Sequence, residues 1–161
     1  MKMVKLDFML KLYLISVSTF ILDILTKNYV QKQIAFGEKV EITSFLSFVH
    51  FQNPGAAFSF LSDQGGWQIY FLITISIFAV IYIPWLINQY KKNMFVVLGL
   101  LLILGGALGN LYDRISYGFV IDFIYFHIDK LYWPAFNIAD SAISVGVFLF
   151  LYGSFRNYKK P

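Results

Sequence analysis

Two aspartates in the second half of the chain, Asp122 and Asp140, are of a type that could together hydrolyse a peptide bond. Asp122 lies inside the apolar stretch at residues 119–124, where an isolated carboxylate needs a partner or a shifted pKa. Asp140 lies at the start of a longer apolar stretch. Two carboxylates that share a low-dielectric site cannot both ionise easily, so one keeps its proton while the other acts as a base. Such a pair can activate water against an amide.

Spacing alone leaves a second interpretation open for Asp140. Asn137 and Asp140 are spaced like a capping box, and an acid suits a helix N-terminus, so Asp140 could serve only to cap a helix. The adjacent residues Asp113 and Arg114 favour, by spacing alone, a solvated helix end, because neighbouring residues of a helix point in different directions.

The chain offers little for other catalytic chemistry. It contains no cysteine, which excludes thiol nucleophiles and cysteine metal sites. His50 and His127 are far apart in the sequence, and no nucleophile elbow, His-x-x-x-His pair or acidic metal cluster is present. Serine and metal catalysis are therefore disfavoured, and no metal or cofactor is expected.

The composition indicates that a membrane surrounds the elements that carry these residues. Of the 161 residues, 58% are hydrophobic and only 14% are charged, and the mean hydropathy is +0.65. A soluble domain of this length needs more polar surface than that. The net charge of +4 forms no basic stripe, so nucleic acid is not expected as a partner. We expect one integral membrane domain spanning residues 1–161.

Four apolar stretches are long enough, or nearly so, to cross the roughly 30 Å hydrocarbon core, which takes about 20 helical residues. They are expected at about residues 10–28, 67–86, 95–112 and 138–155. Gly105 and Gly109 give the third stretch a small-xxx-small face for close helix packing. The segment at about 29–66 is too polar to cross and is rich in β-formers. The expected fold is an all-α polytopic membrane protein, with four transmembrane helices and a small extracytoplasmic β-rich cap.

Basic residues gather at one side of this arrangement, which indicates the cytoplasmic side. These residues are Lys2, Lys5, Lys11, Lys91, Lys92, Arg156, Lys159 and Lys160. Both termini and the loop between the second and third stretches should therefore be cytoplasmic, and the aspartates should lie towards the outer leaflet. Asp23 and Lys27 argue that the first stretch is a retained span and not a cleaved signal peptide.

Four blocks of sequence, in their order and spacing, resemble the lipoprotein signal peptidase (signal peptidase II) family. They are DILTK at 23–27, NPGAAFS at 53–59, GNLYDR at 109–114 continuing to VIDF at 120–123, and FNIADS at 136–141. Any one block alone would be weak evidence, but the joint match extends over most of the chain. One departure is Ile24, where the family often has glutamine.

The resemblance implies that Asp122 and Asp140 are the catalytic pair of an aspartic endopeptidase. It implies that other residues support the site or bind substrate, namely Asp23, Asn53, Gly55, Asn110, Asp113, Arg114 and Asn137. For Arg114 we expect pairing with Asp113 or with a substrate carbonyl. The implied substrates are prolipoproteins bearing a diacylglyceryl cysteine, cut just before that cysteine in the cytoplasmic (inner) membrane of a bacterium. Membrane lipid is the other expected partner, and an oligomer is not required.

Three rival interpretations have less support in the sequence. A presenilin-like or prepilin-type peptidase would resemble a Gly-x-Gly-Asp pattern, whereas Gly105-Gly106 is followed here by Ala107. A proton-linked carrier could use Asp23, Asp122 and Asp140, but the chain shows no inverted repeat. A structural membrane protein would use the acids only to cap helices and set topology.

Overall fold

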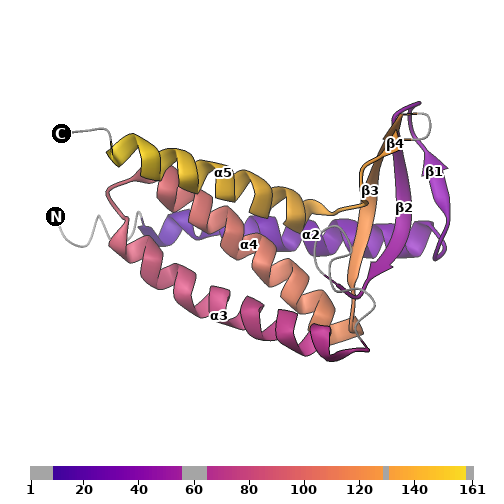
Figure 1. Cartoon of the computed structure of the whole chain (residues 1–161), viewed down its shortest axis with the longest axis horizontal. Helices are drawn as coiled ribbons and strands as arrows, with labels where there is room; N and C mark the ends of the chain where they lie inside the picture. Colours follow the sequence, from indigo (N-terminus) through magenta and orange to yellow (C-terminus); the bar gives the residue numbers. More distant parts are fainter. Residues whose placement is uncertain (1–8, 56–64, 129–130, 159–161) are drawn as a thin grey trace.

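Four long helices and a small antiparallel sheet at one end of them make up the fold (Figure 1). The computed structural model describes residues 9–55, 65–128 and 131–158. The helices are α2 (Leu14–Gln33), α3 (Trp67–Gln89), α4 (Met94–Tyr117) and α5 (Ile138–Tyr158). The strands are β1 (Lys39–Glu41), β2 (Leu46–Asn53), β3 (Val120–Ile128) and β4 (Leu131–Tyr132). Some residues used in the sequence analysis lie outside the described residues. They are the topology-setting lysines Lys2, Lys5, Lys159 and Lys160, and residues 56–59 of the second family-like block.

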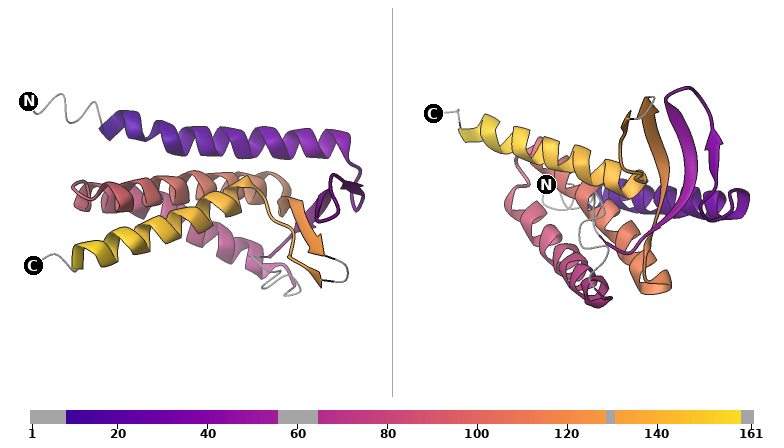
Figure 2. Two further views of the ribbon diagram at one scale, coloured as in Figure 1. Left: turned by 90° about the horizontal axis from the view of Figure 1, so that it is seen from above. Right: turned by 45° about the vertical axis from the view of Figure 1, so that its right-hand side comes forward.

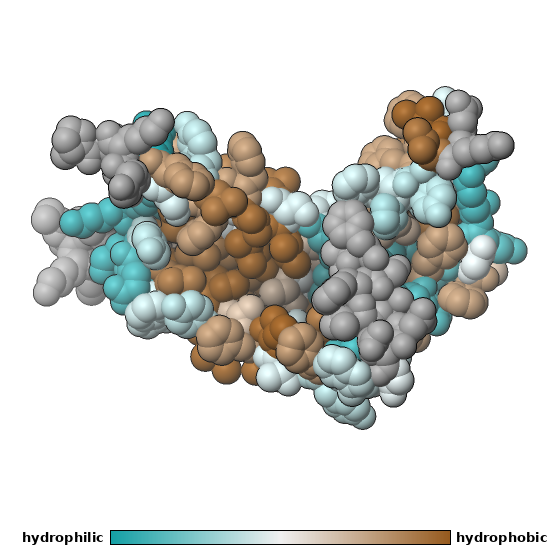
Figure 3. Space-filling view, in the orientation of Figure 1, coloured by the Kyte–Doolittle hydropathy of each residue, from teal (hydrophilic) through white to brown (hydrophobic). Residues whose placement is uncertain are grey.

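All four helices are long and apolar enough to cross a membrane. The candidate spans are Met9–Gln33, Trp67–Gln89, Met94–Tyr117 and Ile138–Arg156. Large apolar side chains point outward from them, such as Phe78 and Ile81 of α3, which are 63% and 71% exposed. Figure 3 shows this apolar surface along the helices, with polar residues at their far end and over the sheet. The expected class, four apolar helices with a β-rich cap, is confirmed.

Helix α4 lies at the centre of the bundle and packs against the other three helices (Figure 2). Its side chains Val96, Val97 and Leu101 are fully buried and form the core together with Ile83 and Ile87 of α3. The helix begins at the capping residue Asn93, whose side chain accepts a hydrogen bond from the Val96 N–H. It ends at Gly118, which has the positive φ of 80° that favours glycine. This central helix carries Asn110, Asp113 and Arg114 to the end of the bundle next to the sheet.

Glycines let the backbones of neighbouring helices come close to α4. A Cβ atom added at Gly99 would lie 2.5 Å from the carbonyl oxygen of Gly146 in α5. One added at Gly105 would lie 2.7 Å from the carbonyl oxygen of Ser16 in α2, and one at Gly109 would collide with the carboxylate of Asp23. The close-packing face predicted from Gly105 and Gly109 is therefore confirmed, and it faces α2.

The sheet runs in the order β1-β2-β3-β4, and every neighbouring pair of strands is antiparallel. Strands β1 and β2 come from the segment in which a sheet was expected. Strands β3 and β4 follow α4, so the sheet is assembled from two distant parts of the chain, which the expectation had not included. Phe48 pairs with Ile124 and Phe51 pairs with Asp122, so the β2–β3 register shifts between these pairs. The shift leaves one extra residue in β2 directly before Phe51. Bulges of this kind re-aim side chains near functional sites.

The substitution Gly99→Ala tests whether close contact between α4 and α5 stabilises the bundle. The added methyl group would force the Gly146 backbone away, and overpacking of this kind costs about 1–3 kcal/mol. We expect a thermal midpoint in detergent that is several degrees lower than that of the wild type. Val147→Ile is the matched control, because it adds one methyl group at an exposed position of α5. An unchanged midpoint for Gly99→Ala would contradict close contact.

Candidate active site

Asp122 and Asp140 line one cavity of about 280 Å³ where the sheet meets the helices. Asp122 comes from β3 and is 4% exposed, and Asp140 comes from the first turn of α5. Asn53, Phe136 and Ser141 also line it. Two acids that are eighteen positions apart along the chain are therefore brought to one pocket by the start of a strand and the start of a helix.

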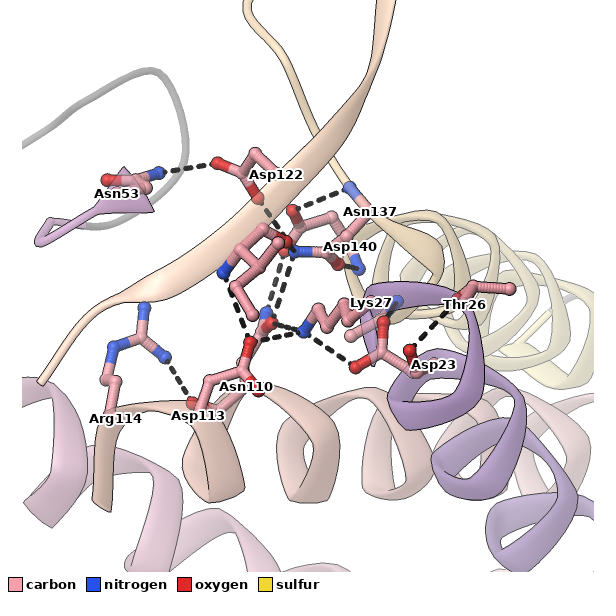
Figure 4. A network of polar contacts seen from close by, with 12 residues as sticks. Asp23, Thr26, Lys27, Asn53, Asn110, Asp113, Arg114, Asp122, Asn137 and Asp140 are labelled. Carbon is pink, nitrogen blue, oxygen red and sulfur yellow. Dashed lines mark hydrogen bonds and ion pairs between the residues drawn. The ribbon is translucent and has the colours of Figure 1, made fainter. Parts of the chain in front are cut away.

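Asn137 joins the two carboxylates (Figure 4). Its side-chain Nδ2 donates to Asp122 Oδ1 at 2.8 Å, and its backbone N–H donates to Asp140 Oδ2 at 3.3 Å. Its Oδ1 in turn accepts from the Asp140 N–H at 2.9 Å, which completes a capping box at the start of α5. The capping contacts predicted for Asn137 and Asp140 are therefore present, and they do not compete with a place in the pocket, because the same cap positions Asp140 beside Asp122.

Two further asparagines hold the remaining carboxylate oxygens. Asn53 Nδ2 donates to Asp122 Oδ2 at 3.0 Å, and Asn110 Nδ2 donates to Asp140 Oδ1 at 2.8 Å. The first contact follows from the sheet register, because Asn53 is opposite Val120, and Asp122 is the next residue of β3 on the same face. Each carboxylate oxygen of the pair thus has a fixed N–H donor, which restricts both side chains to one orientation.

Burial raises the pKa of Asp122 to about 7, and the nearby charge of Asp140 adds to this effect. Hydrogen bonds from Asn53 and Asn137 act in the opposite direction, because they stabilise the ionised carboxylate. Asp122 therefore keeps a proton up to near-neutral pH. This is the behaviour of an acid that shares a site with a second carboxylate.

A buried lysine lies directly beneath this pair. Lys27 of α2 is 1% exposed, and its Nζ atom lies 2.7 Å from Asp23 Oδ2 and 2.9 Å from Asp113 Oδ2. It also donates to Asn110 Oδ1 at 3.1 Å. The two acids then accept backbone N–H groups, Asp23 from Ala139 at 2.8 Å and Asp113 from Ile121 at 3.1 Å. One ammonium group therefore connects α2 and α4 to the segments that carry Asp122 and Asp140.

The solvated helix end expected from the spacing of Asp113 and Arg114 is wrong. Asp113 is 2% exposed and Arg114 is 9% exposed. The expected Arg114–Asp113 pairing is also absent from the part of the chain that the structure describes, because Asp113 faces Lys27 instead. Arg114 donates to two backbone carbonyls, those of Gly55 at 3.0 Å and Asn110 at 3.3 Å.

The residues expected to support the site all lie around the Asp122–Asp140 pocket or in the network beneath it. They are Asp23, Asn53, Gly55, Asn110, Asp113, Arg114 and Asn137. Lys27 was not among them, although it occurs in one of the family-like blocks. The signal that could have identified it is its position four residues after Asp23 in an apolar stretch, where an unpaired charge is costly. No group of three potential metal ligands occurs among the described residues.

Replacing Lys27 by methionine tests the network. The change leaves Asp23 and Asp113 buried without a cation, and breaking a buried pair in this way costs about 3–5 kcal/mol. We expect a large fall in thermal midpoint in detergent and partial recovery in the double variant Asp23→Asn/Lys27→Met. Lys39→Met, which removes an exposed lysine from β1, should change the midpoint little. Equal effects at Lys27 and Lys39 would refute a structural role for the buried charge.

Comparison with known proteins supports one family. The family model for signal peptidase (SPase) II matches residues 15–156. A lipoprotein signal peptidase from Janthinobacterium sp. (strain Marseille) is 46% identical over 140 residues, which are 87% of this chain and 85% of that protein. One from Cellvibrio japonicus (strain Ueda107) is 43% identical over 149 residues, which are 92% and 88% of the two chains.

A solved structure has the same fold. It is a bacterial membrane enzyme determined by the in meso method at 2.3 Å resolution, and it superposes with a TM-score of 0.83 at 32% identity. The superposition covers 92% of this chain and 90% of the other. The family model matches most of this membrane-embedded, multi-pass chain. The chain therefore belongs to the signal peptidase II family.

Proposed function

We propose that this protein is an aspartic endopeptidase that removes the signal peptide from diacylglyceryl-modified prolipoproteins, cutting just before the lipid-bearing cysteine. The observation that carries the proposal is the bridge that Asn137 makes between Asp122 and Asp140 in one buried pocket. The relatives named lipoprotein signal peptidases supply the substrate class. Asp122 and Asp140 are the proposed catalytic pair.

In the proposed reaction, Asp140 acts first as the base and Asp122 as the acid. Asp140 lies in the first turn of α5, where the helix dipole favours a negative charge, and both of its oxygens accept N–H bonds. Asp122, with its raised pKa of about 7, holds the proton. Asp140 removes a proton from water as the water oxygen attacks the scissile carbonyl carbon, and Asp122 protonates the carbonyl oxygen. As the C–N bond breaks, Asp140 gives the proton that it took from water to the cysteine nitrogen, and a hydroxyl of the tetrahedral intermediate returns its proton to Asp122, so that a carboxylic acid and an amine leave and the pair regains its starting state.

The remaining site residues are proposed to position the pair and the substrate. Asn53, Asn110 and Asn137 orient the carboxylates, and Asp23 and Asp113 hold the network beneath them. Arg114 fixes the Gly55 carbonyl, and thereby the segment that follows Asn53, beside the pocket. Their effects on catalysis would therefore be indirect.

We infer that the whole chain, residues 1–161, acts as one domain in the cytoplasmic membrane of a bacterium. Lys91 and Lys92 follow the end of α3, and Arg156 lies in the last turn of α5; these helix ends lie at the end of the bundle opposite the sheet (Figure 1). Because lysine and arginine in short flanking segments favour the cytoplasm, the sheet and the pocket would face the outer leaflet. A substrate anchored by its acyl chains could then reach the pocket without leaving the membrane. Neither a cofactor nor an oligomer is part of the proposal.

The proposed pair is tested by Asp122→Asn and Asp140→Asn in purified protein. Each change removes a proton donor or acceptor in the reaction, so cleavage of a lipidated precursor should fall by at least about 10²-fold. The cleavage product is identified by mass, which also fixes the cut site. Asp122→Asn should fold at least as stably as the wild type, because it removes a carboxyl group whose ionised form is disfavoured by burial.

Glu41→Gln, which neutralises an exposed acid on β1, serves as the control and should cleave at the wild-type rate. The same precursor without its diacylglyceryl group should not be cut. Near-normal cleavage by either aspartate variant would remove that residue from the chemistry. If the folded wild type cuts neither form of the precursor, the proposed substrate is wrong and a carrier function becomes the hypothesis to test.

The pH profile gives a separate test of Asp122 as the acid. Below about pH 7 Asp122 keeps its proton, and above that value the proton is lost, so kcat/KM should fall on the alkaline side with an apparent pKa near 7. Asn53→Ala removes a hydrogen bond that stabilises the ionised form, so the alkaline limb should move to higher pH. Asn88→Ala, at the far end of α3, should leave the profile unchanged. A downward shift for Asn53→Ala would contradict the assignment.

A further inference from the structure

The end of the sheet formed by β3 and β4 projects sideways beyond the helical bundle (Figure 1). Strand β3 runs across the direction of the helices, and its far end reaches past the start of α5. Figure 3 shows a recess between this end of the sheet and the helices, with hydrophobic residues at the projecting end. The proposed peptidase reaction assigns no role to the projecting end of the sheet.

Four large apolar side chains of this hairpin are exposed. They are Phe126 and Ile128 of β3, Leu131 of β4 and Trp133 directly after it, which are 40%, 68%, 78% and 56% exposed. We call these four residues the apolar hairpin surface. A group of exposed apolar side chains marks a surface that contacts a partner or a membrane.

The β3 part of the apolar hairpin surface is on the face of the sheet that packs against the helices. Ile124 of β3 lies in one cluster with Ile34 of α2 and Ile138 of α5, so its side chain points to the helix ends. Because side chains alternate along a strand, Phe126 and Ile128 share the face of Ile124. At the projecting end this face looks into the recess beside the helices.

The two faces of the hairpin differ in polarity. Leu131 pairs with Ile128 and therefore shares its face, and Trp133 is two residues further along the chain. Tyr132 pairs with His127, and these two side chains point to the opposite face. The hairpin is thus amphipathic, with apolar side chains toward the recess and a phenol and an imidazole on the other side.

The recess is the place where the lipid leaflet nearest the sheet reaches the protein. The candidate span of α5 begins at Ile138, and only four residues separate it from Trp133. Lipids packed against the outside of this span extend to the recess below the hairpin. Tryptophan prefers the headgroup zone, and neighbouring apolar side chains reach the boundary with the acyl chains. A soluble partner would have to displace those lipids.

We propose that the apolar hairpin surface lies on the membrane leaflet nearest the sheet, with its side chains at the level of the lipid glycerol groups. The partner is the lipid surface itself. Trp133 also lines the cavity that holds Asp122 and Asp140, so the contact fixes the height of that cavity relative to the leaflet. The contact does not depend on the proposed peptidase activity, and only its benefit to a lipid-anchored substrate rests on that function.

Tryptophans placed on the two faces of β4 test the proposal in lipid nanodiscs, which leave both sides of the bilayer open to water. The three native tryptophans, Trp67, Trp85 and Trp133, are first replaced by phenylalanine. Leu131→Trp then reports on the apolar hairpin surface. Tyr132→Trp is the matched control, because the two residues are adjacent, are 78% and 70% exposed, and point to opposite faces.

Fluorescence quenching is measured with phosphatidylcholine brominated in the upper part of one acyl chain and, separately, with iodide in the water. Interfacial side chains enter the headgroup and acyl boundary by about 5–10 Å. We therefore expect the brominated lipid to quench Leu131→Trp about threefold more strongly than Tyr132→Trp, and iodide to show the reverse order. Equal iodide quenching at both positions would place the surface in water and overturn the proposal.

Two further outcomes are informative. Protection of Leu131→Trp from both quenchers would assign the surface to a protein, such as a second copy of this chain, and would overturn the lipid contact. Ile128→Trp is a second reporter on the same face, and quenching of it like that of Tyr132→Trp would also contradict the proposal. Precursor cleavage is not measured, so failure here leaves the peptidase proposal untouched.

Discussion

The structure depends on keeping one buried lysine paired. Lys27 lies in a span where an unpaired ammonium group would be costly, and Asp23 and Asp113 remove that cost by contacting it directly. The same two acids accept the N–H groups of Ala139 and Ile121, which are the immediate neighbours of Asp140 and Asp122. The same interactions therefore neutralise the lysine and fix the backbone beside the two pocket aspartates. The glycine at 109 allows it, because any side chain there would occupy the position of the Asp23 carboxylate.

Local sequence patterns predicted the parts of this fold that depend on composition and short spacing. Hydropathy predicted the four apolar helices, and Gly105 and Gly109 predicted the close helix packing. The capping box at Asn137 and Asp140 was visible in the sequence because it is a local contact. These features need no knowledge of distant residues, since each follows from burial of side chains or from neighbouring hydrogen bonds.

Contacts between distant segments could not be obtained in this way. Spacing suggested that Asp113 and Arg114 were solvated, because their burial depends on α2 and on the Gly55 carbonyl. The pairing of β2 with β3, which brings Asn53 to Asp122, joins segments separated by all of α3 and α4. The family resemblance named residues that the structure brings together, but it did not explain their positions. The network supplies that explanation, and only Lys27 had to be added to the set.

The short link between β4 and α5, at residues 133–137, restricts how the length of this chain can change. Phe136 exchanges backbone hydrogen bonds with Ile124, and α5 is capped by the very next residue, Asn137. One residue inserted before Asp140 would rotate it by about 100° around the helix axis and away from Asp122. The turn between β1 and β2, at residues 42–45, has no such connection to the pocket. Insertions and deletions should therefore accumulate in that turn among related sequences, while the link to α5 keeps a constant length.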